Sequence, residues 1–163
     1  MVICKHATPL GDMLLAAEAG ALTGAWFENA KYYAAGLEAG SRTDPDDPVL
    51  LRAGEWLDAY FASRRPDPRD LPLRLSGSAF RQSVLRLLLE IPYGGTATYG
   101  QLAERLATLT GNRVSAQAIG GAVGHNPISV IIPCHRVLGA DGSLTGYAGG
   151  LDRKKALLHL ETL

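Results

Sequence analysis

The first 30 residues alternate short apolar runs with turns that contain glycine, proline or aspartate. Residues 22–27 form one such run, and the turns fall at residues 9–12 and 18–20. Short runs joined by tight connections are typical of antiparallel strands. We therefore predict a small antiparallel sheet with the pair Trp26 and Phe27 in its core.

A helical spacing follows a polar, turn-rich loop at residues 31–48. Apolar side chains at positions 50, 53, 57, 60 and 61 share one helix face, with Asp46 or Asp47 as the N-cap and Pro48 in the first turn. Residues 63–72 then hold three prolines, and we interpret them as an extended segment between two domains. The arginines of this segment are expected to be solvated rather than to contact DNA.

The second half of the chain predicts four helices. The first covers residues 79–90, with an apolar stripe at positions 80, 84, 87, 88 and 91. The second covers residues 99–109, with Thr98 as its N-cap and Gln101 as a capping-box partner. A glycine-containing turn leads to a short third helix at residues 116–123, and together the two have the outline of a helix-turn-helix. A last helix is expected after Asp152 as its cap, with Leu151, Ala156, Leu157, Leu158 and Leu160 packing inward.

The third of these helices consists almost wholly of small residues, including Gly120 and Gly121. Each glycine costs a helix about 1 kcal/mol relative to alanine. Tight packing against a neighbouring helix is one explanation. The other, which we favour, is a surface kept thin so that it can enter the narrow minor groove of DNA.

An apolar run of β type, residues 128–132, leads into Pro133 and then into Cys134, His135 and Arg136. Isoleucine and valine dominate the run without helical spacing, so we predict a buried strand that the proline ends. A lone cysteine is more often a small buried hydrophobe than a nucleophile. Here an imidazole and a guanidinium follow the thiol directly, and positive charge favours the reactive thiolate.

Composition and charge narrow the function further. The 163 residues are 47% hydrophobic and carry no net charge. Residues 1–75 hold 8 basic and 11 acidic side chains, a net −3, and residues 76–163 hold 8 and 5, a net +3. The second half is therefore the side expected to meet phosphate. The sequence also lacks a membrane-length apolar run and a signal pattern, which predicts a cytoplasmic protein.

The cysteine and histidine content favours free thiols and no metal. Cys4 and Cys134 are the only cysteines, there is no Cys-x-x-Cys, and the four histidines lack ligand spacing. Taken together, these features predict an α+β protein. Its N-terminal domain, residues 1–75, is expected to be a small α/β unit, and its C-terminal domain, residues 76–163, to be helical and to bind DNA.

The run Pro-Cys-His-Arg resembles the active-site signature of the O6-alkylguanine-DNA alkyltransferases, which repair DNA by direct reversal. The resemblance covers roughly residues 79–161 and includes these motifs in order: Tyr99, Gly120-Gly121, Asn126-Pro127, 133–137, 146–150 and Glu161. It implies a winged-helix-like second domain, no cofactor and, as partner, double-stranded DNA that carries O6-alkylguanine. A monomer is expected, with cooperative binding along DNA left open.

The resemblance also implies roles for individual residues. Cys134 would accept the alkyl group, and the enzyme would be spent by one irreversible transfer. His135 would remove the thiol proton through a water molecule, and Glu161 would hold the imidazole in the correct tautomer. Asn126 would brace the segment between the recognition helix and the active site. An acidic residue at a helix C-terminus opposes the helix dipole, so a partner for Glu161 is expected on physical grounds as well.

Substrate and DNA contacts follow in the same way. Tyr147, Ala148 and the backbone near Val137 would line the guanine pocket, and Tyr99 would press on the phosphate of the flipped nucleotide. The list of residues expected to touch DNA is Tyr99, Arg113, Ala116, Gln117 and Gly121. Gln117 stands where family members commonly carry an inserting arginine, so this chain would fill the base stack without a charge.

Three other functions fit parts of the pattern. A lesion-binding protein without an acceptor thiol would not need Cys134. A winged-helix regulator that senses alkylation would need a partner domain or dimer interface, for which 163 residues leave little room. A Cys-His hydrolase would need an oxyanion hole that the sequence does not reveal.

Overall fold

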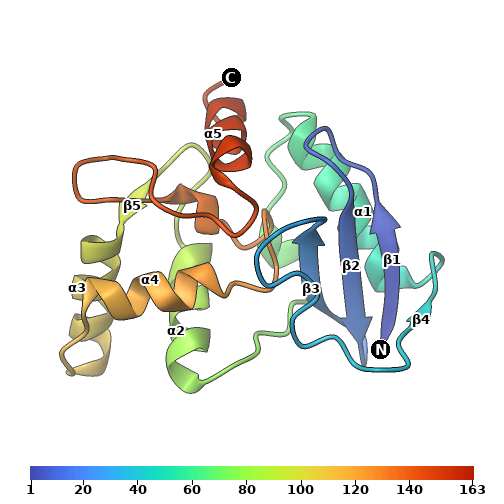
Figure 1. The fold of residues 1–163 in the computed structure, drawn as a ribbon, viewed down its shortest axis with the longest axis horizontal. Coiled ribbons are helices and arrows are strands. Elements are labelled where there is room, and N and C mark those ends of the chain that lie inside the picture. The colour runs from blue at the N-terminus through green and yellow to red at the C-terminus, as the bar shows by residue number, and fades with distance from the viewer.

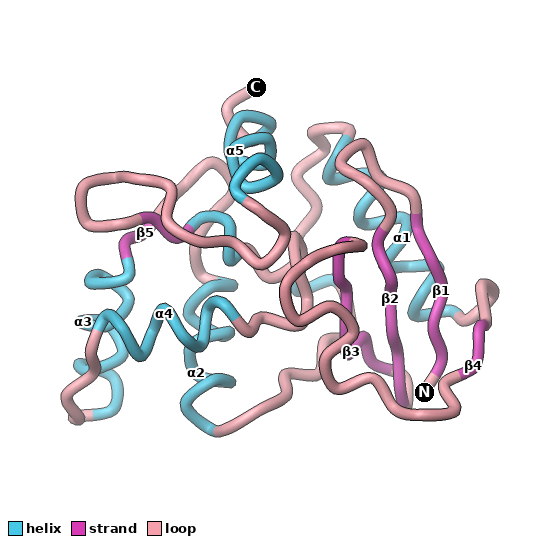
Figure 2. The backbone as a smooth tube through the Cα atoms, viewed as in Figure 1, coloured by secondary structure: helices cyan, strands magenta, loops and turns pink.

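The computed structural model describes residues 1–163 as an α+β protein. A small sheet with one long helix lies beside a group of shorter helices, and the two parts meet along the middle of the molecule (Figure 1). The C-terminal helix stands above the junction, and loops make up much of the chain between the two parts (Figure 2). The predicted fold class is therefore confirmed.

The sheet contains β1 (Val2–His6), β2 (Met13–Glu18), β3 (Ala21–Phe27) and β4 (Arg42–Thr43), in the order β3-β2-β1-β4. The first three strands are antiparallel neighbours, as predicted, while the short β4 pairs in parallel with β1 and interrupts the expected loop. Alternate residues of β2 enter two different apolar clusters. Gly24 in β3 is required because a Cβ there would overlap the Trp26 ring at 2.0 Å.

Helix α1 (Pro48–Phe61) covers one face of the sheet (Figure 1). Asp47 is the N-cap, since its carboxylate accepts from the amides of Val49 and Leu50, and Pro48 occupies the first turn. The apolar stripe faces the core as predicted, although Phe61 is only partly buried. The helix therefore carries its last aromatic residues toward the junction with the helical part.

The proline-rich segment after α1 is not a free linker. It contains a 3₁₀ turn, η1 (Pro68–Asp70), and the Trp56 indole donates to the Asp67 carbonyl at 3.0 Å. Leu71 is buried, and the Leu22 amide donates to the Pro72 carbonyl at 2.7 Å. The expectation of an extended spacer is wrong here because apolar and backbone contacts hold the segment against the sheet domain.

The helical part contains α2 (Ala79–Leu89), α3 (Tyr99–Thr110), α4 (Ala116–Gly124) and α5 (Leu151–Leu160). The capping box of Thr98 and Gln101 forms as predicted. The arrangement of α3 and α4 is consistent with a helix-turn-helix. Two short strands, β5 (Ala97–Thr98) and β6 (Val137–Leu138), pair in parallel and tie the start of α3 to the segment after Cys134.

Three local predictions are wrong. Residues 128–132 are buried but form turns with one isolated bridge to β3, because Val130 has a φ of +70° and the Asn126 side chain bonds this backbone. Helix α5 begins after Gly150 without a side-chain cap, so Asp152 lies in its first turn and Leu151 is exposed. Phe80 is also exposed, since the buried face of α2 begins at Val84.

None of the helices has both the length and the apolar character needed to span a bilayer.

Candidate active site

Cys134, His135 and Arg136 form a single 3₁₀ turn, η2 (Cys134–Arg136), at the centre of the protein. With three residues per turn, successive side chains are rotated by about 120°. The three side chains therefore enter different surroundings although they are adjacent in sequence.

Cys134 lies at the wall of a cavity of about 360 Å³. The other lining residues come from the loop after β3, from α3 and α4, and from the glycine-rich loop before α5: Lys31, Tyr32, Tyr99, Gly120, Gly121, Val123, Gly124, His125, Gly146, Tyr147 and Ala148. Four predicted site residues, Tyr99, Gly121, Tyr147 and Ala148, are thus brought together with the thiol.

The glycines of α4 are not needed for helix packing. A Cβ at Gly120 would meet the Tyr99 ring at 3.8 Å, an ordinary contact, and a Cβ at Gly121 would meet nothing within 4 Å. Tight packing therefore does not account for these two glycines, although Ile119 and Ala122 of the same helix are buried. Both glycines line the cavity, and a thin surface for the minor groove stays a prediction.

Two tyrosines flank the cavity in different states. The Tyr99 hydroxyl donates to the Thr145 carbonyl at 3.1 Å, which links α3 to the glycine-rich loop. The Tyr147 hydroxyl is buried and has no hydrogen-bond partner. Since that hydroxyl is inaccessible to solvent, Tyr147 contributes its ring rather than its hydroxyl to the cavity wall.

The thiol is protonated when the cavity is empty. Burial raises the pKa of Cys134, and the Asn126 side chain and the Lys154 ammonium act against that rise. Since the thiolate is the nucleophile, the site needs a group that removes this proton.

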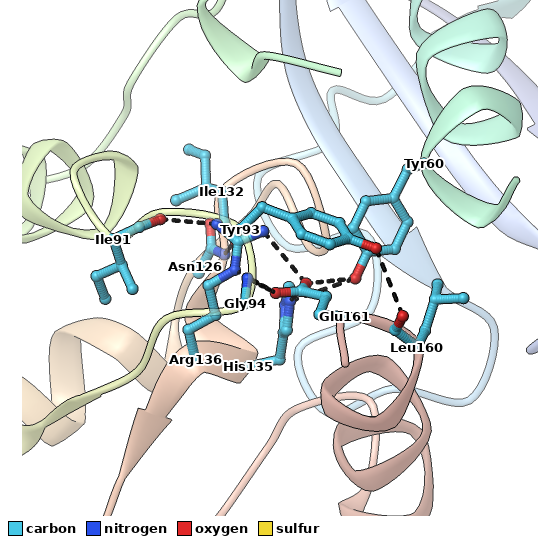
Figure 3. A network of polar contacts seen from close by, with 10 residues as sticks. All are labelled: Tyr60, Ile91, Tyr93, Gly94, Asn126, Ile132, His135, Arg136, Leu160 and Glu161. Atoms are coloured by element: carbon cyan, nitrogen blue, oxygen red, sulfur yellow. Dashed lines mark hydrogen bonds and ion pairs between the residues drawn. The ribbon is translucent and has the colours of Figure 1, made fainter. Parts of the chain in front are cut away.

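The candidate for that base is His135, on the other side of the turn. There the Glu161 carboxylate is bonded by groups from three segments of the chain (Figure 3). His135 Nε2 lies 2.6 Å from Glu161 Oε2, and Arg136 Nε donates to Oε1 at 2.7 Å. The Tyr60 hydroxyl donates to Oε2 at 2.6 Å and the Gly94 amide to Oε1 at 3.2 Å. Glu161 is the C-cap of α5, and the partner predicted for it is confirmed.

The protonation states of this cluster follow from its contacts. Burial disfavours the Glu161 carboxylate, but the hydrogen bonds from His135 and Arg136 outweigh it and lower the pKa of Glu161 to about 2. Burial lowers the pKa of His135 despite its bond to Glu161. A neutral imidazole beside a carboxylate carries its proton on Nε2, so Nδ1, which is buried and unpaired, is left as a base.

Lys154 of α5 bonds the glycine-rich loop that forms one wall of the cavity. It is fully buried, and its Nζ donates to the carbonyls of Val137 at 2.6 Å and of Thr145 and Gly146 at 3.1 Å each. Its ammonium thus holds the glycine-rich loop in place and places a positive charge near Cys134.

Asn126 lies under the turn that leads to Cys134. Its Nδ2 donates to the carbonyls of Ile132 at 2.9 Å and Ile128 at 3.3 Å, and its Oδ1 accepts from the Ile128 amide at 3.0 Å. All three bonds hold the backbone just before the reactive residue.

The remaining predicted residues lie elsewhere. Val137 is fully buried in β6 and does not line the cavity, and its carbonyl accepts from Lys154. Ala116 and Gln117 are exposed in the first turn of α4, on the outer surface. Arg113 precedes that turn and lines a second cavity, of about 580 Å³, between α2, α3 and α4.

Sequence reasoning missed four residues of the site. Tyr60 fitted the apolar stripe of α1, and Lys154 fitted a solvated position of an amphipathic helix, so neither gave a local signal. Lys31 and Tyr32 lie in a loop that only the folded chain brings to the cavity, where the Lys31 amide donates to the Ala148 carbonyl at 2.8 Å. Tyr32 stacks on His125 with a centroid distance of 4.1 Å.

Two family models together match nearly the whole chain. Residues 79–163 match the family model described as 6-O-methylguanine DNA methyltransferase, DNA binding domain. Residues 2–75 match the one described as 6-O-methylguanine DNA methyltransferase, ribonuclease-like domain.

Relatives and solved structures agree with these matches. The methylated-DNA–protein-cysteine methyltransferase of Mycobacterium tuberculosis H37Rv is 43% identical over 156 residues, covering 94% of this chain and 88% of the relative. That of Haemophilus influenzae is 39% identical, covering 97% and 84%. The crystal structure of M. tuberculosis OGT in complex with DNA superimposes with a TM-score of 0.86 at 39% identity, over 99% of this chain and 92% of that one. The chain therefore belongs to the 6-O-methylguanine DNA methyltransferase family.

Proposed function

We propose that this protein repairs DNA by moving an alkyl group from O6 of guanine to Cys134, once per molecule. The observation that carries the proposal is the turn of η2, which presents a thiol to a cavity and an imidazole to a buried carboxylate. A thiol, a base and a group that orients the base are the parts of a nucleophilic site.

The chemistry is a displacement at carbon. His135 Nδ1 accepts the Cys134 proton through a water molecule, and Glu161 stabilises the imidazolium that forms. The sulfur then bonds to the alkyl carbon as the bond from that carbon to O6 breaks, and the released guanine takes up a proton. Because the thioether product is stable, the enzyme is consumed by the reaction.

The target base has to leave the duplex to reach the sulfur. A flipped base costs a few kcal/mol of stacking and pairing and is then read inside a pocket. Tyr147 and Ala148 line that pocket and contact the base. Gln117, exposed in the first turn of α4, fills the space that the base leaves, and Arg113 contacts a phosphate from the preceding turn.

Duplex DNA that carries a single O6-methylguanine tests the proposal. The wild-type protein should remove the methyl group in an amount equal to the protein added. Cys134→Ala should bind the DNA but leave the methyl group in place, and Cys4→Ala, which removes the other free thiol, should transfer normally. Transfer by Cys134→Ala would show that another residue is the acceptor. O4-alkylthymine in the same duplex tests the second candidate substrate.

A lesion-binding protein is the second candidate function, and one observation separates the two. A protein that only binds the lesion does not need a general base next to a cysteine. Here the Glu161 carboxylate and the neutral imidazole support alkyl transfer instead.

A further inference from the structure

One polar atom of the sheet domain enters the catalytic cluster. Tyr60, in the last turn of α1, is 1% exposed, and its hydroxyl lies 2.6 Å from Glu161 Oε2 and 3.5 Å from His135 Nε2. In Figure 3 the Tyr60 ring reaches the carboxylate from the side opposite to Arg136. Trp56 on the same buried face donates to a backbone carbonyl of its own domain, whereas Tyr60 donates to a side chain of the helical part.

The direction of the hydrogen bond follows from the protonation states. Burial, and then the nearby Glu161 carboxylate, raises the pKa of Tyr60, so the phenol keeps its proton. Glu161 is ionised above about pH 2. Tyr60 is therefore the donor. Oε2 is shared by Tyr60, His135 and Arg136 Nη2, while Oε1 accepts from Arg136 Nε and the Gly94 amide.

A buried tyrosine hydroxyl generally finds some partner, so the choice of partner is what matters. Tyr93, whose ring lies edge-on to that of Tyr60, shows the alternative: its hydroxyl donates to the Leu160 carbonyl at 3.5 Å. Tyr60 instead bonds the single oxygen that faces the imidazole. It thereby limits rotation of the carboxylate at the atom that sets the tautomer of His135.

We propose that Tyr60 is a positioning residue for alkyl transfer, through which the N-terminal domain completes the active site. Its hydroxyl holds Glu161 Oε2 against His135 Nε2, which keeps the proton on Nε2 and leaves Nδ1 free to accept the proton of Cys134. This inference rests on the proposed function. It gives the sheet domain a role in the chemistry in addition to its role in folding.

The effect of removing the hydroxyl has a definite sign. The charged and titratable groups around His135 are Lys154 of α5 and Glu161 at its C-cap, Arg136 and Cys134 from its own turn, and Tyr60 from α1. Of these, Tyr60 withdraws charge from the oxygen that binds the imidazole proton. Without it, Oε2 attracts that proton more strongly and the pKa of His135 rises.

The matched pair of variants is Tyr60→Phe and Tyr93→Phe, since each keeps its ring and loses one hydroxyl. The single-turnover rate of methyl transfer is measured from pH 5.5 to pH 9. For Tyr60→Phe we expect the acidic limb of the rate profile to move to higher pH. The rate at pH 7 should fall about tenfold, the lower end of what a hydrogen bond to a charged group contributes. Tyr93→Phe should retain the wild-type profile.

The results that overturn the inference are separate from those that overturn the function. A Tyr60→Phe profile equal to that of the wild type, or equal losses in both variants without a pH shift, would remove the positioning role. Absence of transfer by the wild-type protein would refute the proposed function itself. If Tyr60→Phe does not fold, nitrogen NMR of the histidines in the wild-type protein decides, because a resting His135 protonated on Nδ1 contradicts the inference.

Discussion

The two sides of the η2 turn differ in how fully side chains and hydrogen bonds occupy them. Toward α5, the Glu161 carboxylate binds the imidazole and guanidinium of the turn, and almost every donor has a partner. Toward the cavity, Cys134 faces open space and glycine-rich walls. The satisfied side gives rigidity, and the cavity side leaves room for a ligand. A single turn can therefore hold its base firmly and still present its nucleophile to a substrate.

Breaking the satisfied side should have the largest effect. Glu161→Gln keeps the shape of the side chain but leaves the Arg136 guanidinium without its counter-charge. Removing one partner of a buried ion pair costs about 3–5 kcal/mol, so we expect a loss of that size in the free energy of unfolding, measured in urea. Methyl transfer should also fall to background. A loss below about 1 kcal/mol would mean that the pair is effectively solvated.

Lys154 connects the two sides, and its removal should cost less. Lys154→Met retains most of the side-chain volume but leaves three backbone carbonyls without their donor. We expect a loss of about 2–3 kcal/mol, in line with the cost of unsatisfied buried acceptors, together with slower transfer because residues 145 and 146 are no longer held. Lys155→Met, at the exposed neighbouring position, is the control and should leave both the stability and the rate unchanged.

Acid should weaken the satisfied side in two stages. Burial lowers the pKa of His135 below its ordinary 6.5, so the unfolded state takes up a proton first and stability falls as the pH drops below about 6.5. Glu161 has a pKa of about 2 in the folded protein against 4.5 ordinarily, so its contribution, present above pH 4.5, is lost as the pH falls toward 2. Urea unfolding at about pH 7, 5.5, 4 and 2.5 should show decreasing stability, and Glu161→Gln should remove the second stage, between the last two of these values. Stability that increases toward pH 4 would contradict these protonation states.

The cavity side should tolerate substitution better, and the smallest effect is expected at α4. Gly121→Ala should stabilise the protein by about 0.5–1 kcal/mol, because alanine is the better helix former and its Cβ meets no atom. It should nevertheless weaken binding to duplex DNA if the face of α4 that carries Gly121 contacts the DNA. Gly111→Ala is the contrasting control: the φ there is +72°, so alanine should destabilise the protein. An unchanged affinity of Gly121→Ala for duplex DNA would show that the thin surface of α4 is not needed for DNA binding.

The sequence was most informative where structure is local. The capping box at Thr98, the cap at Asp47 and the need of Glu161 for a partner all depend on residues within one turn of a helix end, and each is confirmed. Residues 128–132 show the opposite case. Their β-branched composition favours a strand, yet side-chain bonds from Asn126 fold them into turns and place Val130 at a φ that such residues rarely adopt.

The site was predictable only in part for the same reason. Cys134 and His135 were identified because a reactive motif stands out along the chain, and Glu161 because the resemblance to the alkyltransferases assigns it to the imidazole. Tyr60 and Lys154 could not be, since a tyrosine in an apolar stripe and a lysine in a helix are the ordinary content of such elements. What makes them part of the site is the packing of α1 and α5 against η2, which no pattern within either helix encodes.

The most direct test of the central claim is peptide mapping by mass spectrometry after incubation with an excess of O6-methylguanine duplex DNA. The account predicts one added methyl group per protein molecule, located on the peptide that contains Cys134, with Cys4 unmodified. An unmodified Cys134 after the lesion has been repaired, or a methyl group on any other residue, would contradict it.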